Sequence, residues 1–275
     1  LNLINKDPKK GEYYLTDIVS VFVSAKEKVN SYLIQDNSIV MGVNDLVAIS
    51  DAEKYFRNNI NQSHMLNGVS LINPDTITIG HEAKIDSGVI IYPNTTITGK
   101  SSISTGSIIG PNTELHNAVI KKNVQVRHSL IYDSKVDERT TIGPFAHLRN
   151  EASIGKDNRI GNYVEIKKSK TGDNTKASHL AYIGDAEVGH NVNFGAGSIT
   201  VNYDGVKKHR TIIGNDVFVG CNSNLVAPLI IESEVFIAAG STVTKNIPTG
   251  SLTIERGKQI NKSDYFYNLI KPKRS

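Results

Sequence analysis

The chain contains no tryptophan, and only seven of its 275 residues are phenylalanine. Large aromatic rings therefore cannot fill its core, and we expect small aliphatic side chains to take their place. The length itself allows a sizeable core, either in one large domain or in a large domain joined to a small one.

Disulfides and membrane-spanning segments are also lacking. Cys221 is the single cysteine, which excludes an internal disulfide framework and suits a reducing compartment. No apolar run reaches membrane-spanning length, and the start, LNLINKDPKK, lacks the apolar core of a signal peptide. We therefore expect a cytoplasmic protein that has no membrane partner.

A strong charge of either sign is missing too. The chain has 31 Lys and Arg against 27 Asp and Glu, for a net charge of +4. Its basic residues form no long run before the C-terminal tail. Nucleic acid is therefore not the expected partner.

The part of the chain before its repeat predicts a small mixed α/β segment. A helix is expected from Ile18, short strands over 31–36 and 38–43, and a second helix from Asp45 that ends near Gly68. These elements are too few for an independent fold, and they look like the end of a domain whose beginning is absent.

A period of six is the strongest pattern in the chain, and aliphatic residues occupy it in three runs. The first run is Ile79, Ile85, Ile91, Ile97, Ile103, Ile109 and Leu115. The second is Val124, Leu130, Val136, Ile142, Leu148, Ile154, Ile160 and Ile166. The third is Ile213, Val219, Leu225, Ile231, Ile237 and Val243.

This period fits the hexapeptide parallel β-helix, in which three hexapeptides make one coil and the aliphatic residues stack inside. We therefore predict a mainly β fold, a left-handed parallel β-helix. The expected division is a nucleotidyltransferase (Rossmann-like) remnant over 1–44, a connecting helix over 45–68, the β-helix over 69–250 and a C-terminal segment over 251–275.

The period breaks twice, between Lys167 and Ile183 and between Thr200 and Ile213. We expect the extra residues to leave the prism as loops, and loops on a rigid scaffold often carry chemistry. The first expected loop contains His179. The second contains Asn202, Tyr203, Lys207 and Lys208.

His179 could act as a general base, because a histidine near its neutral pKa can take a proton from an attacking amine or hydroxyl. The backbone amides of the Gly195-Ala196-Gly197 turn could stabilise an oxyanion. A histidine in a loop is also compatible with an ordinary surface position, so this pattern alone leaves both interpretations open.

Arg149 and Lys167 lie eighteen residues apart, which is about one coil of a hexapeptide β-helix. We expect them to stack, and two stacked cations favour an anion such as phosphate across them. An exposed pair that binds no ligand is the alternative.

Four segments resemble one family closely. They are GPFAHLRN (143–150), IGNYVEIKKS (160–169), KASHLAYIGDAEVGHNVNFGAGSITVNYDG (176–205) and IIGNDVFVGCNSNLVAP (212–228). They are similar to the acetyltransferase domain of the bacterial bifunctional N-acetylglucosamine-1-phosphate uridyltransferase/glucosamine-1-phosphate acetyltransferase. GEYYLTD (11–17) and MGVND (41–45) resemble the end of its uridyltransferase domain.

The resemblance implies transfer of acetyl from acetyl-CoA to the amine of glucosamine 1-phosphate, in UDP-N-acetylglucosamine synthesis for peptidoglycan and other cell-wall polymers. It implies that His179 is the general base and that the protein is a homotrimer with sites between subunits. The implied sugar-phosphate residues are Arg149, Lys167, Tyr182, Asn193 and Lys208. The implied acetyl-CoA residues are Ala196, Asn202, Tyr203, Cys221, Ala239 and Arg256.

Two departures from the family qualify this expectation. Cys221 stands where a serine is common, which can alter contacts to the acyl group but leaves the base in place. The Gly-rich nucleotide loop of the uridyltransferase is missing from the sequence. Asn44 matches a residue of the Mg²⁺ site without its partner aspartate. We therefore expect no uridyltransferase activity from this chain as given.

Two other classes stay open at this point. A zinc enzyme of the hexapeptide carbonic anhydrase type would use histidines, and His147, His179, His190 and His209 are available, although no His-x4-His pair occurs. A non-catalytic trimeric β-solenoid is the other class, and it would bind neither acetyl-CoA nor sugar phosphate.

Overall fold

The computed structural model describes residues 4–36 and 40–270 of the chain. Contacts divide the chain into two units, one up to Glu53 and one from Lys54 onward.

The N-terminal unit is mainly irregular. It contains a 3-10 turn η1 (Leu15–Asp17), the helix α1 (Ile18–Ser24) and the beginning of α2 (Leu46–Leu66). The predicted helix from Ile18 is confirmed. The predicted strand over 31–36 is wrong, because an extended segment becomes a strand only when another strand pairs with it. Residues 40–43 form no strand either, and 37–39 lie outside the described residues.

Helix α2 begins and ends where the sequence predicts. The Asp45 carboxylate accepts a hydrogen bond of 2.8 Å from the Ala48 N–H and so caps the first turn. At the other end Gly68 adopts φ +85°, a left-handed conformation that favours glycine. The Gly68 N–H and Val69 N–H donate back to the Met65 and His64 carbonyls, which closes the helix.

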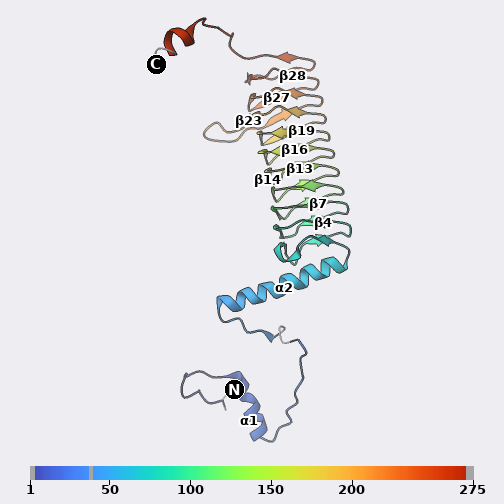
Figure 1. Cartoon of the computed structure of the whole chain (residues 1–275), viewed down its shortest axis with the longest axis vertical. Coiled ribbons are helices and arrows are strands. Elements are labelled where there is room, and N and C mark those ends of the chain that lie inside the picture. Colours follow the sequence, from blue (N-terminus) through green and yellow to red (C-terminus); the bar gives the residue numbers. More distant parts are fainter. Residues whose placement is uncertain (1–3, 37–39, 271–275) are drawn as a thin grey trace. The chain divides into compact units, whose positions relative to one another are not determined.

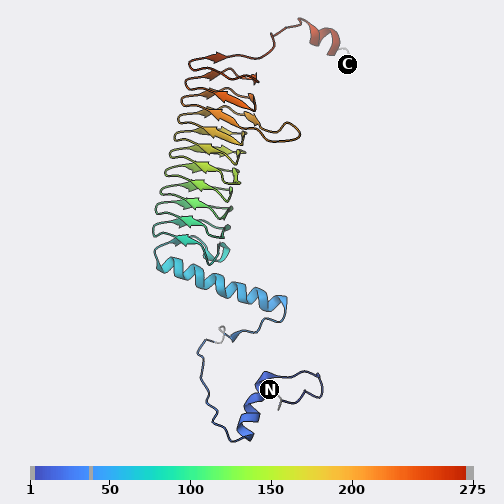
Figure 2. The same ribbon diagram turned by 180° about the vertical axis from the view of Figure 1, so that it is seen from behind.

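The unit from Lys54 onward continues as a three-sided solenoid in which every coil adds one short strand to each of three parallel sheets (Figures 1 and 2). Sheet A contains β1 (Ser70–Leu71), β4 (Ile90–Ile91), β7 (Ile108–Ile109), β10 (Gln125–Val126), β13 (Thr141–Ile142), β16 (Arg159–Asn162), β19 (Lys176–His179), β22 (Asn193–Phe194), β25 (Phe218–Val219), β28 (Phe236–Ile237) and β30 (Leu252–Thr253).

Sheets B and C follow A around each coil. Sheet B contains β2 (Thr78–Ile79), β5 (Thr95–Thr98), β8 (Thr113–His116), β11 (Leu130–Tyr132), β14 (His147–Arg149), β17 (Glu165–Lys167), β20 (Tyr182–Gly184), β23 (Ile199–Val201), β26 (Asn224–Val226) and β29 (Thr242–Val243). Sheet C contains β3 (Lys84–Ile85), β6 (Ser102–Ile103), β9 (Val119–Ile120), β12 (Lys135–Val136), β15 (Ser153–Ile154), β18 (Lys170–Thr171), β21 (Ala186–Val188), β24 (Thr211–Ile213) and β27 (Leu229–Ile231). A short helical turn, η3 (Pro74–Thr76), lies between β1 and β2 in the first coil, and another, Phe266–Ile270, follows the last strand.

The core is the stack of aliphatic residues that the period of six predicts. Its largest fully buried side chains are all isoleucine and leucine, as the shortage of aromatics requires. For one member of the second run, Leu130, the predicted core position is wrong. Leu130 is 39% exposed and the adjacent Ile131 is fully buried, because Leu115 pairs with Ile131 in a coil of only sixteen residues.

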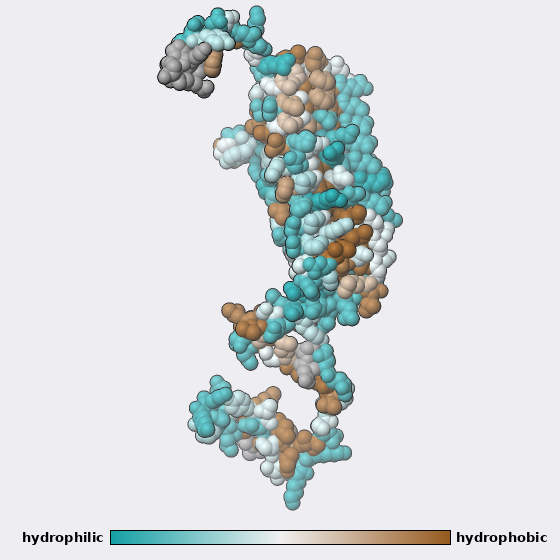
Figure 3. Space-filling view, viewed as in Figure 1, coloured by the Kyte–Doolittle hydropathy of each residue, from teal (hydrophilic) through white to brown (hydrophobic). Residues whose placement is uncertain are grey.

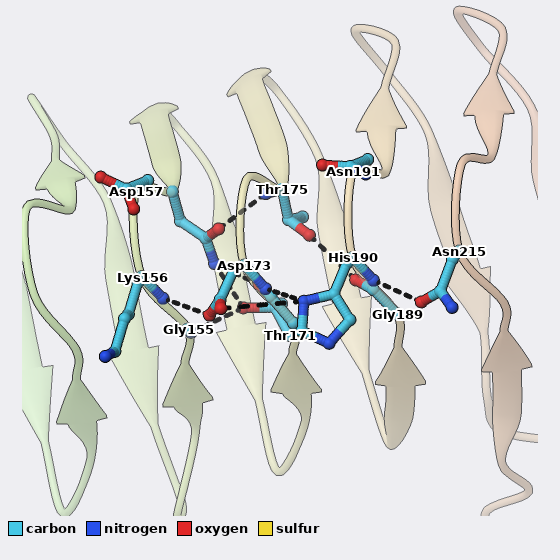
Figure 4. A network of polar contacts seen from close by, with 12 residues as sticks. Gly155, Lys156, Asp157, Thr171, Asp173, Thr175, Gly189, His190, Asn191 and Asn215 are labelled. Atoms are coloured by element: carbon cyan, nitrogen blue, oxygen red, sulfur yellow. Dashed lines mark hydrogen bonds and ion pairs between the residues drawn. The ribbon is translucent and has the colours of Figure 1, made fainter.

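The coils are joined at their corners by repeated polar contacts (Figure 4). The Lys156 N–H donates to Asp173 Oδ1 at 2.8 Å, the Asp173 N–H to His190 Nδ1 at 2.9 Å, and the His190 N–H to Asn215 Oδ1 at 2.8 Å. Each corner amide is thus satisfied by the next coil. The solenoid is a rigid support on which side-chain positions are fixed by register.

The two predicted loops have different outcomes. The loop between Lys167 and Ile183 is wrong, because β18 and β19 continue the prism there and the small residues Thr171 and Ala177 occupy the core positions. The break after Thr200 is a loop, which stands out beside β23 in both ribbon views. No helix in the described part of the chain is long and apolar enough to cross a membrane.

Candidate active site

His179 is the last residue of β19, at the corner between sheets A and B, rather than in a loop as predicted. Its exposed imidazole lies beside Asn162, which is its register partner on β16. The His179 Nδ1 and Asn162 Oδ1 atoms are 2.5 Å apart. The histidine is therefore fixed at one nitrogen and accessible to solvent.

Small residues follow His179 along the same corner in successive coils. The register of sheet A aligns Ala177, Phe194, Val219 and Ile237, so the residues two places later lie on one line. These residues are His179, Ala196, Cys221 and Ala239. The Arg256 guanidinium donates to the Ala239 carbonyl at 3.1 Å, which brings this candidate to the end of the line.

The Gly195-Ala196-Gly197 turn has less free amide than the sequence suggests. The Gly195 N–H donates to the Val219 carbonyl at 2.8 Å, and the Gly197 N–H donates to the Leu180 carbonyl at 2.9 Å. These two amides hold the coils together and cannot also bind an oxyanion. Within the described residues, the Ala196 N–H is the one amide of the three with no recorded backbone acceptor.

Arg149 and Lys167 are register partners on β14 and β17, so the predicted stacking is confirmed. Arg149 already has an anionic partner within the chain, and the assignment of a phosphate to the pair stays a prediction. Glu165 already holds its guanidinium, with a distance of 2.6 Å between Arg149 Nη2 and Glu165 Oε1. This ion pair orients the arginine and leaves Lys167 as the less satisfied cation.

Lys208 reaches Lys167 from the loop that leaves the prism after β23. Contact with the Lys208 ammonium is the main cause that lowers the pKa of Lys167, and desolvation adds to it. Asp185 acts in the opposite direction on the same lysine. The same contact between the lysines raises the pKa of Lys208, and two neighbouring basic groups favour an anionic ligand beside them.

Asp185, Asn202 and Tyr182 form the floor beside these cations. The buried Asn202 side chain donates to Asp185 Oδ2 at 2.6 Å, and its second contact is the Tyr182 hydroxyl at 3.4 Å. The resemblance assigns Asn202 to acetyl-CoA, but its side chain lies beside Tyr182, a sugar-phosphate candidate. Through its bond to Asp185 it joins the base of the loop to the prism.

The loop itself is a small hairpin with a Tyr203–Lys208 antiparallel bridge. The Asp204 carboxylate accepts the Val206 and Lys207 N–H groups at 2.8 and 2.7 Å and lies 2.6 Å from His209 Nε2. These contacts lower the pKa of Asp204 to about 2, and the Lys207 amide is the largest cause. Tyr203 is exposed.

Two candidates lie apart from this cluster. Asn193 is on sheet A, paired in register with Lys176 and Phe218, whereas Tyr182 and Lys167 are on sheet B. Asn44 belongs to the N-terminal unit and is exposed. A single prism therefore does not bring Asn193 to the cations.

Three residues of the site were not singled out from the sequence, namely Asn162, Glu165 and Asp185. Asn162 precedes His179 by seventeen residues, and Glu165 precedes Lys167 by two. Both positions become meaningful once the coil length is known to be seventeen or eighteen residues. Asp185 follows a coil in which small residues replace the aliphatic residues of the core. The period of six is not visible there, so it could not predict the position of Asp185.

The histidines that a zinc site would need are dispersed. His147 lies on sheet B, His190 at the corner between sheets C and A, and His209 in the hairpin. Burial lowers the pKa of His147, whose Nε2 is buried without a partner. No group of three or more His, Cys, Asp or Glu suited to a metal ion occurs among the described residues, which does not favour the zinc interpretation.

Comparisons with known proteins find a hexapeptide transferase repeat and close relatives of one kind. Residues 210–245 match the model of the bacterial transferase hexapeptide (six repeats). The chain is 62% identical over 273 residues to the bifunctional protein GlmU of Acholeplasma laidlawii, covering 99% of this chain and 59% of the relative. It is 49% identical over 265 residues to the same protein of Clostridium botulinum, covering 96% and 58%.

A solved structure, the UDP-N-acetylglucosamine acyltransferase of Francisella novicida, is more distant. It shares 18% identity with a TM-score of 0.49, over 67% of this chain and 66% of the other. The relationship therefore rests on the two GlmU relatives, and the chain spans somewhat more than half of their length. Over nearly its whole length the chain is therefore similar to the bifunctional GlmU proteins, and it spans 58–59% of their length.

Proposed function

We propose that this chain transfers the acetyl group of acetyl-CoA to the amine of glucosamine 1-phosphate. The observation that carries the proposal is the position of His179, at the corner between a cationic cluster on sheet B and a line of small residues on the next coils. The similarity to the bifunctional GlmU proteins supports the identity of both substrates.

In this reaction His179 takes a proton from the neutral sugar amine as the nitrogen attacks the thioester carbonyl. The new C–N bond forms a tetrahedral intermediate, whose collapse breaks the C–S bond. The protonated His179 then returns its proton to the departing sulfur, so that CoA leaves as its thiol. The Ala196 N–H, which lies one coil beyond His179, is the proposed donor to the oxyanion.

The sugar phosphate is bound by Lys167 and Lys208, with Arg149 held in place by Glu165. Two neighbouring basic groups favour a phosphate beside them, which is the physical reason for this assignment. Tyr182 and Asn193 orient the sugar ring. The grouping of Tyr182 with Asn202 and Asp185 supports its part in this assignment.

Acetyl-CoA lies along the line of small residues in this proposal. Ala196, Cys221 and Ala239 have side chains short enough to let an extended cofactor chain approach the backbone, and Arg256 at the end of the line suits its phosphates. The exposed Tyr203 completes the set from the hairpin, with Asn202 supporting its base.

A homotrimer with sites between subunits is part of the same proposal. Asn193 and the cationic cluster lie on different faces of one prism, so a second copy is needed to bring them to one sugar. We also place the protein in the cytoplasm, where acetyl-CoA is made and where a lone thiol such as Cys221 stays reduced.

The product is proposed to enter UDP-N-acetylglucosamine synthesis for peptidoglycan and other cell-wall polymers. Asn44 stays a prediction as a residue of a magnesium-dependent uridyltransferase site. No group of three or more His, Cys, Asp or Glu that could hold a metal ion occurs among the described residues.

The experiment is release of free CoA thiol from acetyl-CoA, with and without glucosamine 1-phosphate. We expect release that requires the sugar phosphate and falls by about 100-fold or more in His179→Ala, in line with loss of a general base. His116→Ala changes a histidine on a distant coil and serves as the control. A folded protein that releases no thiol would contradict the proposal and favour a non-catalytic solenoid.

A further inference from the structure

The contact between Asn162 and His179 is fixed by the backbone as well as by the side chains. The two residues are register partners on adjacent strands, and the Leu180 N–H donates to the Asn162 carbonyl at 2.9 Å immediately beside them. The ladder between β16 and β19 therefore holds the two backbones side by side and keeps the Asn162 amide within reach of the imidazole. The distance of 2.5 Å between Oδ1 and Nδ1 is a short hydrogen bond.

This contact selects one protonation pattern of the neutral imidazole. An amide oxygen can only accept, so a hydrogen bond to it requires a proton on Nδ1. The lone pair of neutral His179 is then on Nε2, for which no protein partner is recorded within the described residues. Because a neutral histidine side chain with no partner carries its proton mainly on Nε2, the contact reverses the usual preference.

Asn162 differs from the other asparagines of the corners. Those residues commonly adopt positive φ, as Asn150 does at 53° and Asn174 at 57°, or accept a backbone N–H from the preceding coil, as Asn215 does. Asn162 is not among the residues with positive φ, and the left-handed position of its corner is taken by Tyr163 at 56°. Turn formation therefore does not explain its amide, whereas the contact with His179 does.

We propose that Asn162 is a positioning residue that holds His179 in the Nδ1–H form and so leaves the Nε2 lone pair free to accept the proton of the substrate amine. The second half of this statement rests on the proposed acetyl transfer. The first half, the protonation pattern, concerns the free protein and can be measured without any substrate.

The first test reads the protonation pattern directly. In protein labelled with 15N-histidine, the His179 imidazole is identified by the signals that His179→Ala removes, at a pH about two units above the ordinary histidine pKa. We expect the Nδ1–H form in the original protein and in Asn162→Asp, which keeps an oxygen acceptor. In Asn162→Ala we expect the Nε2–H form to predominate. An unchanged pattern in Asn162→Ala would overturn the proposal.

The second test separates positioning from a general structural effect. Asn162→Ala should lower kcat by about fivefold to tenfold, the effect of one hydrogen bond on the competent population, with KM for both substrates within about twofold. Asn162→Asp should restore most of the loss. Thr98→Ala removes the Oγ1 partner, at 2.9 Å, of His116 on a distant coil, and it should leave kcat unchanged.

The outcomes distinguish this inference from the proposed function. If the original protein shows the Nδ1–H form and releases no thiol, the acetyl-transfer proposal fails while the effect of Asn162 on the imidazole stands. If the protein is active and Asn162→Ala changes neither the imidazole signals nor kcat, the inference fails and the acetyl-transfer proposal stands. A loss of kcat that Asn162→Asp does not restore would also overturn it.

Discussion

At the scale of residues, the cations of the site are held in two different ways. Arg149 is oriented by the Glu165 carboxylate on the neighbouring strand, so its position does not depend on a ligand. Lys208 is the main reason for the lowered pKa of Lys167, and the same contact raises the pKa of Lys208. The two lysines have no carboxylate ion pair like that of Arg149 among the described contacts, so a phosphate beside them would be favoured.

Replacement of Lys208 should consequently act on the sugar phosphate alone. We expect Lys208→Met to raise KM for glucosamine 1-phosphate by about 10-fold to 100-fold, the loss of a charged hydrogen bond, and to leave KM for acetyl-CoA within about threefold. The same change raises the pKa of Lys167 towards its ordinary value. Lys207→Met removes an equal charge from the same hairpin and serves as the control. If steady-state kinetics gave the same rise in KM for both variants, the overall positive charge of the hairpin, and not a contact of Lys208, would be responsible.

At the scale of elements, the hairpin after β23 leaves the prism and contains candidate site residues, among them Tyr203 and Lys208. Its turn is held by Asp204, which accepts two backbone N–H groups and contacts His209. The pKa of the carboxylate is lowered from 3.8 to about 2, so its ionised form stabilises the folded hairpin. That stabilisation is complete above pH 4 or so, and it is lost as the pH falls towards 2.

Asp204→Asn should loosen this hairpin without affecting the prism. We expect hydrogen exchange of the Val206 and Lys207 amides to become about fivefold faster, because each loses a bond to a charged acceptor. Exchange in the core strands, such as β17, serves as the internal control. Unchanged exchange at both amides would show that the other contacts of the hairpin, such as the Tyr203–Lys208 bridge, are enough to hold the turn.

The phase of the coils is a second point at this scale, and it can be tested by stability. Ile131 is fully buried while Leu130 is 39% exposed, contrary to the strict period of six. We expect Ile131→Ala to reduce the free energy of unfolding by about 2–5 kcal/mol and Leu130→Ala by less than about 1 kcal/mol. Chemical denaturation measures both free energies. A larger loss in Leu130→Ala than in Ile131→Ala would contradict the structure and favour Leu130 as the core residue.

How much the sequence could predict follows from these elements. The aliphatic period predicted the three-sided solenoid, and a spacing of eighteen predicted that Arg149 and Lys167 stack, because register in a solenoid is set by coil length. The coil around His179 could not be predicted in this way. Thr171 and Ala177 fill its core with small side chains, so a continuous prism was interpreted as a loop.

The partners of the site residues were harder still to predict. Asn162 is one coil before His179, but coils of sixteen, seventeen and eighteen residues alternate along the chain, and the sequence gives no direct count of each. Lys208 meets Lys167 only because the hairpin folds back, which depends on the local contacts of Asp204. Such contacts follow from turn geometry and not from the period.

At the scale of the whole solenoid unit, site residues occupy two faces of the prism. The face in Figure 3 is mixed, with hydrophobic residues gathered over β4 and β7, where Ile90 and Ile108 are register partners. Further along the same sheet Phe218 and Phe236 stack with ring centroids 4.5 Å apart, and both are exposed. These apolar areas on sheet A, the sheet that carries Asn193, are consistent with the proposed packing of copies.

A site shared between copies predicts complementation. His179→Ala and Asn193→Ala should each be poorly active alone, and trimers mixed from the two variants should regain about a quarter or more of the original rate when the two residues come from different copies. Thiol release after co-expression measures this. Mixed oligomers no more active than the single variants would mean that each prism contains a whole site, or that the copies do not assemble.

The central claim is acetyl transfer to the sugar nitrogen with His179 as the base, and product analysis tests it most directly. Glucosamine 1-phosphate incubated with acetyl-CoA and the protein should yield a compound heavier by one acetyl group, with the amide N–H of an N-acetyl sugar in its NMR spectrum. His179→Ala should form it about 100-fold more slowly or worse. Acetylation at a hydroxyl, or an unchanged rate in His179→Ala, would contradict the account.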